Sequence, residues 1–271
     1  MTSWTANDLP DQTGRTVVIT GAGRGLGLIT AREFARVGAR VVLGVRDEGK
    51  ARQAVAGLPG TFVIRPLDVS DLTSVRAFAD FWSGDIDILI NNAGVMDIPA
   101  ARTADGLDLQ TTTNHTGPFL LTNLLLEHIT DRVVHVTSDL HKQGKIDLAD
   151  LDWRTRKHNG MRAYQASKLA AVLFSLELQR RLTAAGSPVR SVLASPGIAR
   201  TTLAAHSRSN VTNARCSHGR PAVGRDRRPR RVGHPMSDLS CLSYLEAVTA
   251  RRSAPAYSAG PAPPLSATGE S

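Results

Sequence analysis

A tyrosine and a lysine four residues apart, Tyr164 and Lys168, are the pair best suited to acid–base chemistry. Residues at this spacing share one face of a helix. A phenol with a pKa of about 10 is a poor catalyst at neutral pH, but a nearby ammonium stabilises the phenolate and lowers that pKa. Tyr164 could then exchange a proton with a carbonyl or alcohol oxygen that Ser138 also holds. The alternative is that both residues simply belong to a helix surface.

A glycine-rich stretch after the apolar run at 16–19 is a candidate phosphate site. It follows the pattern T-G-x-x-x-G-x-G, with Thr20, Gly21, Gly25 and Gly27, and a helical pattern begins within it. Glycine lets the backbone come close to a pyrophosphate, and a helix N-terminus supplies free N–H groups and positive potential. The alternative is a glycine-rich turn without a ligand.

Short apolar strands alternate with amphipathic helices around these residues. Strands are expected at 15–20, 40–45, 61–64, 86–90, 132–137 and 189–193. Helices are expected at 26–37, 48–56, 70–81 (with Ser70 as N-cap), 106–129 and 162–183, with a loop at 139–160. The alternation predicts an α/β fold with a doubly wound parallel sheet. Such sheets bind ligands at the carboxyl ends of their strands, where the residues above fall.

Composition limits the remaining possibilities. The 271 residues suit one domain, expected at 14–205 after a polar lead-in at 1–13. The cysteines, Cys216 and Cys241, have neither metal-ligand spacing nor a disulfide framework. No basic segment precedes an apolar one at the N-terminus, and no apolar run is long enough to span a bilayer. We therefore expect a cytoplasmic protein without a membrane partner.

The net charge of +9 is concentrated late in the chain. Residues 206–271 hold ten arginines and four acidic residues, so the basicity belongs mostly to this segment. Few aromatic residues accompany the arginines, and nucleic-acid binding is therefore not expected. Steeply salt-dependent DNA binding by 206–271 is the alternative.

The strand and helix periods end near Asn210. Beyond it Arg, Pro, Ser, Gly and Ala dominate, half of the fourteen prolines occur, and no pattern for a seventh strand is visible. GC-rich DNA read in a shifted frame gives this composition. We interpret 206–271 as an atypical, partly disordered tail that follows a frame change, genuine or a sequencing error.

The ordered set of motifs resembles the short-chain dehydrogenase/reductase family over residues 15 to about 205. The resemblance is carried by Thr20-Gly21-x-x-x-Gly25-x-Gly27, Asp68, Asn91-Asn92-Ala93-Gly94, Asn114, Ser138, Tyr164-x-x-x-Lys168, and Pro196-Gly197 with Thr201. V-V-H-V-T-S, A-Y-x-x-S-K-L-A and the long loop between serine and tyrosine resemble the retinol-dehydrogenase-like branch. The chain is also similar to anthracycline-pathway ketoreductases, which implies an aromatic polyketide side-chain ketone as substrate.

The resemblance implies a Rossmann fold and a role for each motif residue. Tyr164 is the general acid, Lys168 lowers its pKa and holds the nicotinamide ribose, Ser138 orients the carbonyl, and Asn114 supports a water relay to Lys168. Asp68 contacts the adenine, and 196–201 hold the nicotinamide amide. The implied cofactor contacts are Thr20, Gly21, Arg24, Gly25, Leu26, Gly27, Arg46, Asp68, Val69, Asn92, Ala93, Gly94, Tyr164, Lys168, Pro196, Gly197 and Thr201.

The end of the second strand favours NADP(H) over NAD(H). An acidic residue there would bind the ribose hydroxyls of NAD, but the matching residue is Val45. Arg46 and Arg24 would suit a 2′-phosphate. Asp47 is an unfavourable neighbour for that phosphate, and a merely solvated Arg46 is the alternative.

The expected function is hydride transfer between NADP(H) and a ketone or secondary alcohol. The alternative is a cofactor-binding protein with little turnover, because the substrate-covering region after about 210 does not follow the family pattern. His115, His135 and His141 lack ligand spacing, so no metal is expected. The small-molecule substrate and the oligomeric state stay open.

Overall fold

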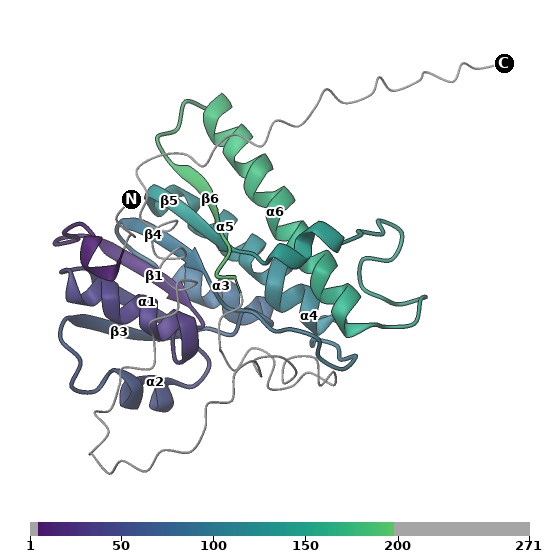
Figure 1. The fold of residues 1–271 in the computed structure, drawn as a ribbon, viewed down its shortest axis with the longest axis horizontal. Helices are drawn as coiled ribbons and strands as arrows, with labels where there is room; N and C mark the ends of the chain where they lie inside the picture. The colour runs from purple at the N-terminus through teal and green to yellow at the C-terminus, as the bar shows by residue number, and fades with distance from the viewer. Residues whose placement is uncertain (1–4, 198–271) are drawn as a thin grey trace, which may run out of the picture.

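The computed structural model describes residues 5–197, in which six strands form one parallel sheet (Figure 1). Their order is β3-β2-β1-β4-β5-β6. The strands are β1 (Thr16–Thr20), β2 (Arg40–Val45), β3 (Thr61–Pro66), β4 (Ile86–Asn91), β5 (Ile129–Val136) and β6 (Arg190–Ala194). The order reverses between β1 and β4, which confirms the predicted doubly wound sheet. Thr201, the boundary at 205 and the tail at 206–271 lie outside the described residues.

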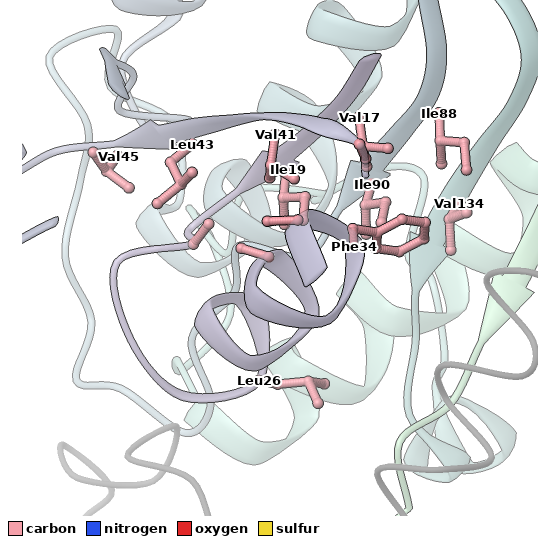
Figure 2. Close-up of a cluster of buried hydrophobic side chains, with 14 of the residues drawn as sticks. Val17, Ile19, Leu26, Phe34, Val41, Leu43, Val45, Ile88, Ile90 and Val134 are labelled. Carbon is pink, nitrogen blue, oxygen red and sulfur yellow. The ribbon is translucent and has the colours of Figure 1, made fainter. Parts of the chain in front are cut away.

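The strands are apolar because both faces of the sheet are covered. In β1, Val17, Val18 and Ile19 are completely buried. Val17 and Ile19 pack with Phe34 on the face covered by α1 (Gly25–Arg36) and α2 (Glu48–Val55), as Figure 2 shows for the first of these helices. Val18 faces the opposite cluster, built with α3 (Leu72–Asp80), α5 (Gly117–Leu125) and α6 (Gly160–Ala184). The alternation of side chains along one strand thus supplies two cores.

Polar side chains fix where three helices begin. Asp47 accepts a hydrogen bond from the Lys50 N–H at the start of α2, and Asn159 accepts one from the Arg162 N–H, so α6 begins two residues before the predicted start. Ser70 was the wrong N-cap for α3. Its hydroxyl donates to the Asp68 carboxylate at 2.6 Å, and Asp71 caps the helix instead.

The helix predicted over 106–129 is wrong as one element. The structure has α4 (Leu109–Thr111), a π-helical turn η2 (Thr112–Thr116), α5 and a 3₁₀ turn η3 (Leu126–His128). Gly106 lies in a turn with φ of 73°, and Ile129 already belongs to β5, where it pairs with Ile86. Gly117, at the start of α5, contacts the Val69 carbonyl so closely that a Cβ would overlap it.

The loop after β5 has nearly the predicted extent and contains turns that the sequence did not predict. It begins with a 3₁₀ turn, η4 (Asp139–Gln143), and continues through further turns to the start of α6. A shorter 3₁₀ turn, η1 (Ala6–Asp8), precedes β1. No helix within residues 5–197 has both the length and the apolar character needed to cross a membrane.

Candidate active site

A cavity of about 420 Å³ opens at the carboxyl ends of the strands, where the strand order reverses. Its volume lies in the range of small-molecule and cofactor sites. The predicted site residues that line it are Gly21, Arg24, Gly25, Leu26, Gly27, Arg46, Asp68, Val69, Asn92, Ala93, Gly94, Ser138, Tyr164, Lys168, Pro196 and Gly197. The structure thus brings together residues spread over the whole described chain.

The glycine loop packs its backbone against the segment that follows β4. Gly21 has φ of 68°, and a Cβ there would come within 3.0 Å of the Ala93 backbone. A Cβ on Gly27 would lie 2.6 Å from the Asn92 side-chain nitrogen and 2.8 Å from the Gly21 carbonyl oxygen. Gly23 differs, because a Cβ there would make only ordinary contacts at 3.6 Å or more. The spacing of Gly21 and Gly27 therefore follows from packing as well as from any bound phosphate.

Thr20 lies beneath the cavity and joins two strand ends. Its hydroxyl oxygen accepts hydrogen bonds from the backbone N–H groups of Asn92, at 3.0 Å, and Ala93, at 2.9 Å. The Asn92 amide donates to the Thr20 carbonyl at 2.8 Å. Thr20 and Asn92 thus hold the glycine loop against the end of β4.

The corner beyond β2 and β3 carries more free positive than negative charge. Arg24, Arg46 and Lys50 line it. The Asp47 carboxylate already caps α2 and lies 2.7 Å from the Lys50 ammonium. Asp68 accepts two hydrogen bonds from Ser70 and lies 3.9 Å from the Arg46 guanidinium. Both carboxylates therefore already have hydrogen-bond and basic partners. Asp47 thus does not argue strongly against binding of a phosphate in this corner.

Tyr164 and Lys168 come from one face of α6 and are both buried in the opposite corner, with exposed fractions of 2% and 4%. The Lys168 ammonium donates to the Val136 carbonyl at 2.9 Å and lies 5.8 Å from the centre of the Tyr164 ring. Ser138 lies two residues after the end of β5, and its carbonyl contacts the His141 ring nitrogen Nδ1 at 2.7 Å. The two helical residues and the serine therefore meet at one end of the cavity.

Burial shifts the pKa values of both helical residues. It raises the pKa of the Tyr164 phenol, and the Ser138 hydroxyl offsets this only in part. Burial lowers the pKa of Lys168 to about 8. Burial rather than the ammonium sets the direction of the phenol pKa shift here, because Lys168 faces the Val136 carbonyl; the role of Lys168 in lowering that pKa stays a prediction. Tyr164 keeps its proton at neutral pH and can act as a proton donor.

Asn114 does not line the cavity but lies behind it, on the π-helical turn. Its side chain accepts a hydrogen bond from the Val95 N–H at 2.8 Å and donates to the Val95 carbonyl at 2.9 Å and to the Ser167 hydroxyl at 3.0 Å. A Cβ on Gly94 would lie 3.2 Å from the Asn114 side-chain oxygen and 3.5 Å from the Lys168 ammonium. Asn114 therefore links the segment after β4 to α6, while its role in a relay stays a prediction.

Several lining residues were not singled out from the sequence. They are Lys50, Leu67, Val95, Leu109, Thr113 and Val136. The signal for Lys50 was its position three residues after Asp47, one turn along a predicted helix. The acceptor for Lys168 could not be found in this way, because it is a main-chain carbonyl on another strand.

Residues 15–212 match the family model described as short chain dehydrogenase. The chain belongs to the short-chain dehydrogenase family. Retinol dehydrogenase 13 of Homo sapiens is 44% identical over 205 residues, which cover 71% of this chain and 61% of that protein. The chain therefore spans less than two thirds of that relative. Such relatives confirm the retinol-dehydrogenase-like branch, while the resemblance to anthracycline-pathway ketoreductases stays a prediction.

Solved structures share the fold. An uncharacterized protein from Mycobacterium paratuberculosis is 53% identical with a TM-score of 0.71, and the match covers 77% of this chain and 82% of that one. A structure described as an NAD(P)-dependent gluconate 5-dehydrogenase from Beutenbergia cavernae, with NADP bound at low occupancy, is 27% identical with a TM-score of 0.58. That match covers 75% of this chain and 80% of the other.

Proposed function

We propose that this protein is an NADP(H)-dependent carbonyl reductase or alcohol dehydrogenase. The proposal rests on one observation: the same cavity has a candidate proton donor at one end and a candidate phosphate site at the other. A buried phenol that keeps its proton lies beside a buried lysine at one end, and a glycine cradle with three basic residues lies at the other. NADP(H), when bound, supplies or accepts the hydride.

The cradle fits a dinucleotide phosphate. The glycine loop brings free N–H groups at the start of α1 to the cavity, and its tight packing leaves no room for side chains at Gly21 and Gly27. Arg24 and Arg46 would hold the 2′-phosphate, as guanidinium groups do. The bound NADP in the Beutenbergia structure supports this choice.

The residues at the reacting end divide the work on the substrate oxygen. Tyr164 donates its proton to the carbonyl oxygen during reduction and accepts it back during oxidation. Ser138, whose hydroxyl faces the same end of the cavity, orients that oxygen. Lys168 carries positive charge near the phenol, and its pKa of about 8 leaves it largely protonated at neutral pH.

The names of the relatives support a lipophilic alcohol or carbonyl as the substrate class, because the human relative is a retinol dehydrogenase. A more specific alternative is an aromatic polyketide ketone, which the resemblance to anthracycline-pathway ketoreductases implies. Since the chain spans only part of that relative, substrate identity has to be measured directly.

The test is a titration with NADPH, followed by NADPH consumption with retinal, an aromatic polyketide ketone and a small water-soluble ketone. We expect saturable binding of NADPH and turnover of at least one carbonyl. Binding without any turnover would instead support the alternative of a cofactor-binding protein, which the end of the family match at residue 212 of 271 favours. Failure to bind NADPH would contradict both the proposed reductase and the alternative of a cofactor-binding protein.

A further inference from the structure

The loop 139–159 joins Ser138 to the start of α6. It exposes apolar side chains and buries a charged one. Leu148 is 85% exposed and Leu151 is 51% exposed, although Asp150 between them is buried. Single exposed leucines are ordinary on protein surfaces. Two exposed leucines at successive turns, with a buried carboxylate between them, are less common. Figure 1 shows the loop projecting from the body of the molecule beside the N-terminal end of α6.

Hydrogen bonds on the inner side hold this conformation. The Asp150 carboxylate accepts from the backbone N–H groups of Arg154, Thr155 and Arg156. The Arg156 guanidinium lies 3.8 Å from the centre of the Trp153 ring. Because Asp150 anchors the loop backbone at 154–156 from inside, the outward position of the leucines is part of the fold.

The free charge on this loop is positive. Its carboxylates all have basic partners, in the pairs Lys142–Asp139, Arg154–Asp152, Arg156–Asp147 and Arg156–Asp150. Lys145 and Lys157 of the loop, and Arg162 in the first turn of α6, are exposed, and none of them has an ion-pair partner within residues 5–197. Three of the five lysines of the chain lie in this loop. Exposed leucines therefore occur together with uncompensated basic side chains.

We infer that the loop 139–159 docks on an anionic lipid surface. Leu148 and Leu151 would enter the boundary between headgroups and acyl chains, and Lys145, Lys157 and Arg162 would face anionic headgroups. The inference rests on the proposed function for one consequence only: an enzyme held at that surface would meet a lipophilic carbonyl or alcohol dissolved in it.

A lipid surface suits these residues better than a second protein does. A stable protein interface buries upwards of about 1,000 Å² and depends on a well-packed centre, whereas this loop offers two leucines at turn tips. Membrane binding needs no shape complementarity, because apolar burial and headgroup attraction add residue by residue.

The test is flotation of the full chain with phosphatidylcholine vesicles, with and without phosphatidylserine. We expect binding only with phosphatidylserine, and release by high salt. Leu148→Asp/Leu151→Asp should weaken vesicle binding by at least about tenfold, because the apolar anchor is lost. Lys145→Glu/Lys157→Glu should weaken it by at least as much, since each basic residue near such a surface contributes about fivefold.

Matched controls come from α3 and its end, away from the loop. Phe81→Asp removes an apolar side chain that is 76% exposed, and Arg76→Glu reverses an exposed charge without an ion-pair partner in the described chain. Both should bind vesicles as the wild type does. Thermal unfolding and NADPH binding of each variant report whether the fold is intact.

Three results would overturn the inference: no flotation of the wild type, equal losses in the loop and α3 variants, or loop variants that change only the oligomeric state. The last would indicate contact between copies of the chain. Flotation needs no turnover, so vesicle binding without carbonyl reduction would refute the proposed function alone. If both hold, the leucine variant should keep its turnover of a small water-soluble ketone and lose turnover of vesicle-bound retinal.

Discussion

The two ends of the cavity are built by opposite means. At the nucleotide end, the backbone comes so close that a Cβ on Gly27 would lie 2.6 Å from Asn92. At the reacting end, buried side chains fill the space and bond to the backbone: Lys168 donates to the Val136 carbonyl, and behind it Asn114 bonds to the Val95 backbone and the Ser167 hydroxyl. The first end is therefore damaged by adding atoms and the second by removing them.

The largest effect is expected from removing a single oxygen at the reacting end. Tyr164→Phe deletes the proton donor and should cut turnover by at least about a hundredfold, the low end of general-acid effects. NADPH affinity, measured by fluorescence titration, should barely change, because the cradle lies at the other end. Turnover like that of the wild type would remove Tyr164 from the chemistry.

The next effect concerns the charge at the nucleotide end. Arg46→Ala should weaken NADPH binding by about tenfold to a hundredfold, since a charge-assisted hydrogen bond to the 2′-phosphate is lost. NADH binding should change little, and calorimetric titration with both cofactors measures the difference. Arg52→Ala is the matched control on α2, because Arg52 pairs with Glu48 outside the cavity. Equal losses for NADPH and NADH would mean that Arg46 does not contact that phosphate.

Substitution of alanine for each of two glycines in the glycine loop should change the free energy of unfolding by different amounts. Gly27→Ala should lower the free energy of unfolding by about 1–3 kcal/mol, because the new Cβ overlaps Asn92 and the Gly21 carbonyl. Gly23→Ala should leave it nearly unchanged, as its Cβ meets only ordinary contacts. Chemical denaturation without cofactor measures both. Similar losses in the two variants would contradict the packing argument.

The most gradual effect is a pH dependence of stability. Burial lowers the Lys168 pKa from 10.5 to about 8, so between these values the unfolded chain holds a proton that the folded protein has released. The free energy of unfolding should therefore rise with pH across that window, by at most about 1.4 kcal/mol per pH unit. Denaturation of the wild type and Lys168→Met at pH values on either side of 8 measures this slope. Identical slopes would show that burial does not shift this lysine.

The sequence predicted the central strands well because β1, β2 and β4 are apolar runs buried on both faces. It failed at 106–129, where apolar residues continue from α5 into β5 and hide the change of structure at Ile129. The members of the reacting end were predicted from motif spacing. Their electrostatics were not, because four-residue spacing says nothing of burial or of the Val136 carbonyl that accepts from Lys168. Such tertiary contacts have no periodic signature.

The tight contact between Gly117 and the Val69 carbonyl sets a limit on protein engineering. Val69 lines the cavity, and Gly117 follows the turn that carries Asn114. A grafted loop from an enzyme with another coenzyme preference would have to reproduce the path of that carbonyl within a few tenths of an ångström. Redesign of coenzyme preference should therefore exchange side chains at Arg24 and Arg46 and leave the main chain around Val69 untouched.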